Sequence, residues 1–252
     1  MPAVADLAPP DRGALAAWIG ERPETILAVA ALLAGVGRMW ISGSPTEPDA
    51  ALIESPLVPG EPHGFGRPSA IVDLLAGADD WRCIELDPST AQRLEGEFDR
   101  LWGLQRVVID VVHRLDRAVE IRHHRLVREL TLDDLSQLAQ ARDVLPDDEA
   151  VVAASSAAGT LFGAVDSDVI VGQAGSMAAG SRFADVGVHV AEPYRRQGIA
   201  TAAASQTCAI LRRREVTPVW STGAHNAASL AVAKTLGFTE IATLTYLVRD
   251  RT

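Results

Sequence analysis

The stretch that decides the fold is FADVGVHVAEPYRRQGIATAAASQTCAIL, residues Phe183 to Leu211. Three valines in its first part alternate with Asp185, Gly187 and His189, and this period of two predicts a strand. Pro193 ends the strand, because proline cannot donate a hydrogen bond to a ladder. After the break, residues recur at steps of three and four, as on one face of a helix: Ile199, Ala203, Thr207, Ile210 and Leu211.

The junction between this strand and this helix, residues 195–200 (RRQGIA), has the properties of an anion site. The first N–H groups of a helix have no partner inside the helix, and the helix dipole adds partial positive charge there. Gly198 permits turn dihedrals and a close approach of the backbone to a bulky anion. Arg195 and Arg196 add donors suited to phosphate. On these residues alone, an ordinary strand–turn–helix with solvated arginines is an equal alternative.

RRQGIA also matches the Q/R-x-x-G-x-G/A signature of the GNAT superfamily of N-acetyltransferases. The preceding FADVGVHV resembles the strand before that signature. Downstream, PVWST reads as a strand, and Asn226, Ser229 and the LGF at 236–238 resemble the second block of the family. The resemblance covers roughly Arg125 to Thr252 and is greatest to two-domain bacterial members with a C-terminal catalytic domain.

The resemblance implies an enzyme that transfers the acetyl group of acetyl-CoA, its co-substrate, to a primary amine of a small molecule or peptide. It puts the pyrophosphate on Arg195, Arg196, Gln197, Gly198, Ile199 and Ala200, and the pantetheine arm along backbone groups near Val188 and Val190. Asn226 and Ser229 are further candidates for contacts with this co-substrate. From the residues alone, Asn226 is equally a helix N-cap, and Ser229 equally a residue of the helix face.

Asp185 and His189 are the candidate catalytic residues. Asp185 stands where some relatives have a glutamate that acts as general base, and strand alternation puts it on the same face as His189. The alternatives are a solvated or salt-bridged aspartate and a packed histidine, with a water relayed from backbone carbonyls as the base.

The sequence departs from the family at Ala233, where many members have a tyrosine that protonates the leaving thiolate. Tyr194 and Tyr246 are the two tyrosines of the chain, and the sequence places neither at the sulfur. A CoA thiolate can also leave unassisted as a stable anion. The missing tyrosine motivates a second hypothesis, a catalytically silent acyl-CoA-binding module that senses or regulates.

Composition limits the other functions of this 252-residue chain. Its net charge of −10 argues against general nucleic-acid binding. Cys83 and Cys208 form no CxxC pair, His123-His124 has no partners at ligand spacing, and we expect no metal. The N-terminal residues lack a basic leader segment, and the longest apolar run, Ile26 to Val36, is too short to span a membrane. We therefore expect a reduced cytoplasmic protein, a monomer or homodimer, with no membrane partner.

The order of predicted elements gives an α/β (α+β) fold with two domains, residues 1–122 and 123–252. In the second, the order β-α-β-β-β-α-β-α-β is the one a GNAT-like mixed sheet flanked by helices implies. It includes a hairpin at Asp166-Ser167-Asp168, a helix or mobile loop at 143–158 and a final strand at 241–248. The basic residues 114–128, predicted as a solvated face or a linker, span the boundary between the two domains.

The first domain is smaller and also alternates helices and strands. The residues from Ser55 to Pro68 contain four prolines and three glycines and are predicted as a loop. Its Gly64–Pro68 segment fits a glycine-rich nucleotide loop poorly, because Pro68 interrupts it and no long strand precedes it. A degenerate GNAT-like domain and an unrelated α/β cap both remain open for this half.

Overall fold

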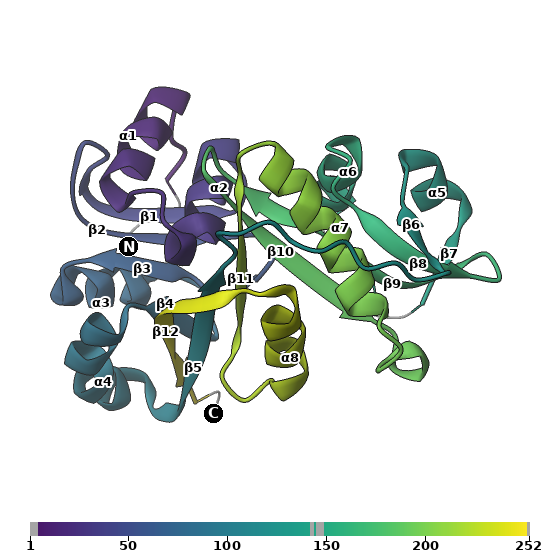
Figure 1. Ribbon diagram of the computed structural model, residues 1–252. Coiled ribbons are helices and arrows are strands. Elements are labelled where there is room, and N and C mark those ends of the chain that lie inside the picture. Colours follow the sequence, from purple (N-terminus) through teal and green to yellow (C-terminus); the bar gives the residue numbers. More distant parts are fainter. Residues whose placement is uncertain (1–4, 142–143, 145–148, 251–252) are drawn as a thin grey trace. The chain divides into compact units, whose positions relative to one another are not determined.

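The computed structural model describes residues 5–141, 144 and 149–250 (Figure 1). The chain forms two compact units. Unit 1 comprises Met1–Val112 together with Ala242–Thr252, and unit 2 comprises His113–Ile241. The end of the chain therefore belongs with its beginning, and the boundary near residue 122 stays a prediction about independently folding domains.

Unit 1 is a mixed sheet with helices on both faces. Its elements are α1 (Pro9–Ile19), η1 (Pro23–Thr25), α2 (Ile26–Ala34), β1 (Arg38–Ser44), β2 (Glu47–Glu54), β3 (His63–Gly66), α3 (Pro68–Gly77), β4 (Cys83–Leu86), α4 (Pro88–Trp102), most of β5 (Leu104–Arg114) and most of β12 (Thr239–Arg249). Strands β1, β2 and β3 pair antiparallel in sequence order, β3 pairs parallel with β4, and β4 pairs antiparallel with β12.

Alternation along β2 divides the core of unit 1 into two layers. Leu52 packs with α3 and α4 in a cluster that also contains Leu247 of β12. Its neighbours Ala51 and Ile53 pack with α1 and α2 on the opposite face. Every one of these four side chains is fully buried. The C-terminal strand is thus part of the core of unit 1.

The predicted loop from Ser55 to Pro68 is wrong at one place, because residues 63–66 form strand β3. The sequence HGFG lacks the β-branched residues that mark a strand. Tertiary packing explains its glycine content: a Cβ at Gly64 would lie 2.8 Å from side-chain atoms of Ile84 and Leu86. Packing against β4 therefore requires a residue of low strand propensity here.

The strands of unit 2 also pair in both parallel and antiparallel fashion. Its elements are β6 (Val127–Glu129), α5 (Leu132–Gln137), β7 (Ala139–Gln140), α6 (Glu149–Ala157), β8 (Phe162–Asp166), β9 (Val169–Ala179), β10 (Phe183–Val190), η2 (Glu192–Tyr194), α7 (Ile199–Arg213), β11 (Thr217–Gly223) and α8 (Ala227–Leu236). Strands β6, β8, β9 and β10 pair antiparallel in that order, and β10 pairs parallel with β11.

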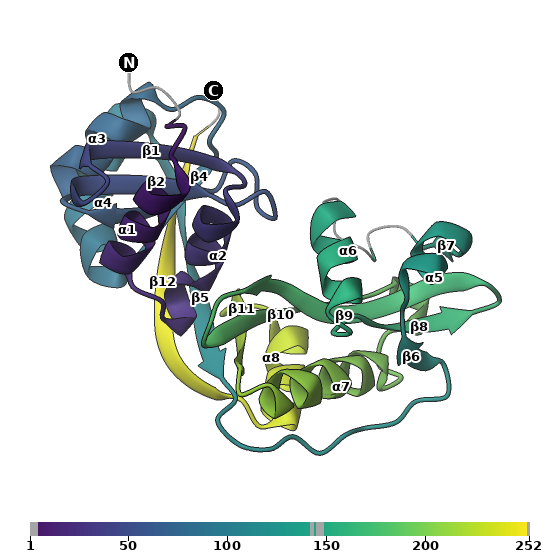
Figure 2. The same ribbon diagram turned by 90° about the horizontal axis from the view of Figure 1, so that it is seen from above.

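The hairpin predicted at residues 166–168 is confirmed. β8 and β9 pair antiparallel across it, and Ser167 and Asp168 have φ values of 51° and 62°. The segment predicted as a helix or mobile loop, residues 143–158, contains α6, whereas residues 143 and 145–148 lie outside the described residues. In Figure 2, α7 covers one face of the unit 2 sheet and α6 lies on the other.

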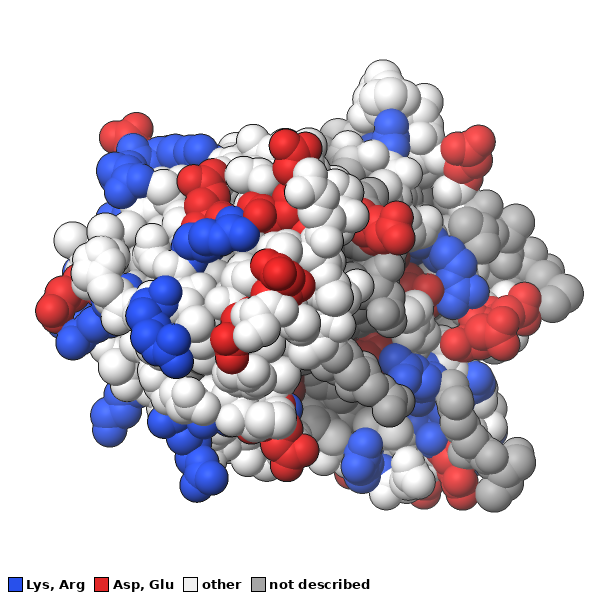
Figure 3. All heavy atoms as spheres, turned by 90° about the vertical axis from the view of Figure 1, so that its right-hand side faces the viewer, with Lys and Arg blue, Asp and Glu red and all other residues white. Residues whose placement is uncertain are grey.

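On the face of the molecule seen in Figure 3, basic and acidic side chains of the described residues are interspersed rather than gathered by sign. Among the described residues, no helix is both long and apolar enough to span a membrane. The same residues contain no group of three or more His, Cys, Asp and Glu side chains arranged to hold a metal ion.

Candidate functional site

Strands β10 and β11 of unit 2 begin as a parallel pair and then part. The register joins Phe183 to Thr217, Ala184 to Pro218 and Asp185 to Val219. Beyond Asp185, β10 continues to Val190 and stays paired with β9 alone. Backbone groups of residues 186–190 on the β11 side are consequently available to a ligand that lies along the strand. This is the part of β10 for which the sequence predicted contacts near Val188 and Val190.

The turn after β10 opens the longest helix of unit 2. Arg196 and Gly198 both adopt left-handed backbone conformations, with φ values of 61° and 86°. Gly198 is the N-cap of the 15-residue helix α7 and has no side chain with which to cap it. The first N–H groups of α7 are thus left for another partner, and a Cβ built on Gly198 meets nothing within 4 Å. Unpartnered donors and open space are the features that an anion site at a helix N-terminus requires.

The side chains of this turn divide into two roles. Arg195 Nε donates to the carbonyl of Val190 at 2.9 Å, and Gln197 Nε2 donates to the carbonyl of Pro193 at 3.1 Å. The first bond ties the turn to the end of β10, and the second ties it to η2. Arg196 is exposed, and its left-handed backbone directs the turn toward α7. Ile199 is buried, so it anchors the first turn of the helix while Ala200 is half-buried beside it.

Asp185 and His189 lie on one face of β10 but not at one point. The alternate residues Val186 and Val188 pack in the core with residues of α7. Asp185 and His189 are four positions apart along the strand, about 13 Å at 3.3 Å per residue. Asp185 lies where β10 and β11 part, next to an irregularity in the register with β9. His189 is exposed near the turn. A single reacting atom can therefore meet one of them, not both.

Asn226 and Ser229 have structural partners. The Asn226 side chain caps α8 by accepting from the Ser229 N–H at 3.1 Å, which is the helix-cap alternative drawn from the sequence. The Ser229 hydroxyl accepts from Trp220 Nε1 at 2.9 Å. These bonds fix the start of α8 against β11. A contact of either residue with a co-substrate stays a prediction.

The hydroxyl groups of both tyrosines of the chain form hydrogen bonds with carboxylates. Tyr194 donates to Asp166 Oδ2 at 2.9 Å, and Tyr246 lies in unit 1 and donates to Glu85. The hydrogen bond to Asp166 raises the pKa of Tyr194. Ala233, at the position of the usual tyrosine, is fully buried in the core of unit 2. The general acid of many family members thus has no counterpart among these residues.

Sequence reasoning missed two polar residues on β9. Gln173 lies across from His189, and Ser176 lies across from Val186 beside the irregular step of β10. Gln173 Oε1 and Ser176 Oγ are buried without a hydrogen-bond partner. Buried polar atoms normally have partners, so these two are candidates to receive one from a bound molecule. The available signal was a glutamine and a serine within an apolar strand.

The sequence of unit 2 matches a family model. Residues 155–247 match the model described as GNAT acetyltransferase. Residues 155–247 therefore carry a GNAT acetyltransferase domain. The matched range begins in α6, contains the parted strands and the turn at 195–200, and ends in β12. The identification from the RRQGIA signature is therefore confirmed, and acyl transfer is the reaction class of this GNAT family.

Solved structures extend the GNAT fold over nearly the whole chain. A GCN5-related N-acetyltransferase-like protein from Streptococcus suis is 20% identical, with a TM-score of 0.64, and the match covers 95% of this chain and 99% of that one. A GCN5-related N-acetyltransferase from Sphaerobacter thermophilus is 15% identical, with a TM-score of 0.61 and coverage of 99% and 96%. A tandem GNAT protein from the clavulanic acid biosynthesis pathway is 15% identical, with a TM-score of 0.53 and coverage of 96% and 94%. No curated protein matches the sequence significantly.

Proposed function

We propose that this GNAT protein transfers an acetyl group from acetyl-CoA to a primary amine of a small molecule or peptide, and that unit 2 performs the reaction. The observation that carries the proposal is the turn between β10 and α7. It combines an uncapped 15-residue helix, two left-handed residues and open space at Gly198. A pyrophosphate is the anion that such a turn accommodates.

The parted strands supply the second half of the proposal. An extended pantetheine arm presents amide groups that can pair with the open edge of residues 186–190, as an added strand would. Acetyl-CoA contributes the activated thioester. The protein then has to accept a proton from the attacking amine and stabilise the carbonyl oxygen.

Asp185 is the residue we propose as the general base. It lies where β10 leaves β11, so the thioester end of an arm lying along β10 from the turn reaches this part of the strand. His189 lies about 13 Å away along β10 and closer to the turn, so its proposed role is contact with the co-substrate. With Ala233 in place of a tyrosine, the thiolate leaves without a phenol to protonate it.

The proposal is tested by release of free CoA thiol from acetyl-CoA in the presence of a panel of primary amines and amino-terminal peptides. With an accepted amine, Asp185→Asn is expected to lower kcat by about 100-fold, the scale of a general base. The affinity for acetyl-CoA should stay within about twofold of wild type. An unchanged kcat and pH–rate profile would remove Asp185 and favour a base water relayed from backbone carbonyls.

A catalytically silent acyl-CoA sensor is the second candidate, favoured by Ala233 and by the partners of both tyrosines. The two functions share acetyl-CoA binding and differ in turnover. If acetyl-CoA raises the melting temperature but no amine in the panel gives thiol release above the rate without enzyme, the sensor is supported and the transferase proposal fails.

A further inference from the structure

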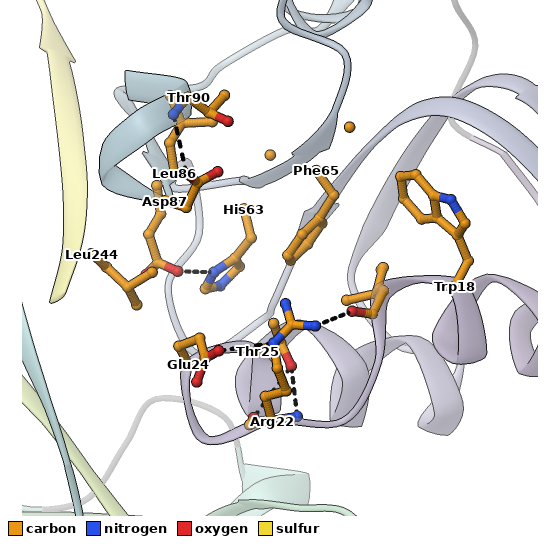
Figure 4. Close-up of a pocket in the computed structure, with 14 residues that line it drawn as sticks. Trp18, Arg22, Glu24, Thr25, His63, Phe65, Leu86, Asp87, Thr90 and Leu244 are labelled. Carbon is orange, nitrogen blue, oxygen red and sulfur yellow. Dashed lines mark hydrogen bonds and ion pairs between the residues drawn. The ribbon is translucent and has the colours of Figure 1, made fainter. Parts of the chain in front are cut away.

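Unit 1 has a pocket of its own. The pocket has a volume of about 300 Å³ and lies where β3 and β4 part, since these strands pair at one position, His63 with Glu85 (Figure 4). Residues from α1, η1, β3, the start of α4 and β12 line it, all within unit 1. This volume is at the lower end of the range for small-molecule sites.

A buried hydrogen-bonded chain forms one wall of the pocket. His63 Nδ1 lies 2.6 Å from Glu85 Oε1, and the Tyr246 hydroxyl donates to the other oxygen of Glu85. The side chains of His63 and Glu85 are 3% and 5% exposed. A carboxylate this deeply buried needs a cationic partner, and His63 is the one with which it pairs. The pair therefore holds His63 as an imidazolium.

The second ring nitrogen of His63 has no partner. His63 Nε2 is buried without a hydrogen bond, and Figure 4 shows the ring extending from β3 toward Arg22 and Glu24. Burial by itself lowers the pKa of His63, but the charge and hydrogen bond of Glu85, with the charge of Glu61, raise it above its usual value. An imidazolium with Nδ1 bonded to Glu85 has one N–H left, at Nε2, on a ring that lines the pocket.

The other polar groups of the pocket are already engaged. Arg22 Nε donates to Glu24 at 2.8 Å, and its Nη1 donates to the carbonyl of Ile19 at 2.9 Å. Asp87 caps α4 by accepting from Ser89 and Thr90. Two cationic and three anionic side chains line the pocket, an excess of one negative charge: Arg22 and His63 against Glu24, Glu85 and Asp87.

These charges select the kind of ligand. A carboxylate could accept from His63 Nε2 but would lie among three carboxylates. An ammonium would suit the negative excess but cannot accept a hydrogen bond. An uncharged carbonyl oxygen satisfies the donor without either conflict. Phe65, Trp18 and Leu244 provide apolar surface for the rest of the molecule.

We infer that the pocket of unit 1 is a second binding site, for a small uncharged molecule that carries a carbonyl oxygen on an apolar body. The carbonyl accepts from His63 Nε2, and the apolar body packs on Phe65, Trp18 and Leu244. The site is independent of the acetyl-CoA turn of unit 2.

Three matched probes test this inference on the full-length protein: phenylacetamide, phenylacetate and phenethylamine. They share a phenyl group and differ in being neutral, anionic and cationic. Ligands of about ten non-hydrogen atoms bind with millimolar Kd, so titration to about 20 mM followed by the ring ¹⁵N signal of His63 is suitable. We expect a saturable shift with phenylacetamide and at least tenfold weaker effects with the two charged probes. Absence of a saturable shift with phenylacetamide, or a charged probe binding as well, would overturn the inference.

Two substitutions connect binding to the pocket. His63→Gln assigns the signal and should weaken phenylacetamide at least tenfold, whereas His123→Gln, an exposed histidine outside the pocket, should change nothing. Because loss of the ion pair can unfold unit 1, Leu244→Phe provides a second test that narrows the pocket without touching His63. Equal binding of phenylacetamide to wild type and Leu244→Phe contradicts the assignment to this pocket. Gly198→Asp should leave phenylacetamide binding unchanged, which separates this site from the proposed acetyl-CoA site.

Discussion

The two units contain the same strand pattern and connect it differently. In each, an antiparallel pair is followed by a parallel pair, β2–β3–β4 in unit 1 and β9–β10–β11 in unit 2, with a helix between the parallel strands. In unit 2, residues 191–198 separate β10 from α7. In unit 1, Arg67 alone separates β3 from α3, and Pro68 occupies the first turn of that helix. Proline has no N–H to offer an anion. The proposed pyrophosphate site therefore depends on the connection between strand and helix and not on the strand order.

The point where the parallel strands part also differs. In unit 2, β10 runs five residues beyond its last pairing with β11, to Val190. In unit 1, β3 has four residues, and its single pairing with β4 is occupied by the His63–Glu85 ion pair. One geometry leaves an open strand edge for an extended ligand, and the other leaves a small pocket with one unpartnered donor. Shared topology thus accommodates two kinds of binding site.

The largest expected effect is a loss of stability. It tests whether β12 stabilises unit 1 without contributing to the proposed acetyl-CoA site. Leu247→Ala removes a fully buried side chain from the core shared with β2, α3 and α4. We expect a loss of about 2–5 kcal/mol in the free energy of unfolding, measured by urea unfolding and tryptophan fluorescence. Four of the five tryptophans are in unit 1, so the signal reports mainly on that unit.

The matched change in unit 2 is Leu211→Ala in the core under α7. It should weaken acetyl-CoA binding, whereas Leu247→Ala should leave the affinity for acetyl-CoA within about twofold. If Leu247→Ala leaves the unfolding midpoint unchanged, β12 does not carry the stability assigned to it here.

The next largest effect is on the affinity for acetyl-CoA, and it compares substitutions in the two strand–helix connections. Gly198→Asp adds a negative charge at the N-terminus of α7 and forces an L side chain into a φ of 86°. We expect about 100-fold weaker acetyl-CoA binding, or about 2.7 kcal/mol. Arg67→Asp makes the corresponding change in unit 1 and should alter the affinity by less than twofold. Calorimetric titration with acetyl-CoA measures both.

Gly198→Ala is the control for backbone strain, because it adds the Cβ without the charge. It should weaken binding less than Gly198→Asp does. An Arg67→Asp protein with equally impaired acetyl-CoA binding would mean that the two connections do not differ as described.

Sequence reasoning succeeded where a local pattern carried the structure. The alternation at 183–190, the turn with Gly198 and the Asp166–Asp168 hairpin all have short-range causes, and they lead to the GNAT fold. It failed at β3, because HGFG forms a strand for reasons of packing against Ile84 and Leu86. It also could not associate β12 with β4, since residues 83–86 and 245–248 are far apart in the chain and no local pattern records their pairing.

The candidate site divides in the same way. The turn at residues 195–200 was predicted as a candidate anion site from six residues. The positions of the unpartnered Gln173 and Ser176 atoms depend on the strand register, which a local pattern does not give. The His63–Glu85–Tyr246 chain joins three segments, of which two are 161 residues apart. Such groupings have no signature in a single sequence.

The smallest expected effect is a change with pH in the stability of unit 1. Because Glu85 and Glu61 raise the pKa of His63 above 6.5 against the effect of burial, its ionised form stabilises the folded state. That contribution is complete below the unfolded pKa of about 6.5 and is lost as the pH rises through the folded pKa. Other ionisable groups near the ring are Arg22, Glu24, Asp87 and Tyr246.

Urea unfolding of wild type and His63→Gln between pH 6 and pH 9 measures this contribution. The stability difference between the two proteins should decrease as the pH rises, and phenylacetamide binding should weaken over the same interval. A difference that is constant with pH would show that folding does not change the pKa of His63, and a difference that grows with pH would show that the folded protein favours the neutral ring. Unit 2 offers the comparison, since Asp185→Asn should leave this pH dependence unchanged.

The place of β12 in unit 1 has a consequence for biosynthesis. A ribosome releases the chain from its N-terminus, and domains ordinarily fold as they emerge. Unit 1 cannot complete its fold in this way, because Leu247 of its core and Tyr246, which donates to Glu85, follow unit 2 in the chain. Residues 1–112 therefore lack strand β12 until unit 2 has been synthesised, and one edge of their sheet stays unpaired during that time. During that interval the edge of β4 is exposed to other chains. We expect nascent chains stalled before residue 242 to depend on chaperones more than the finished protein does.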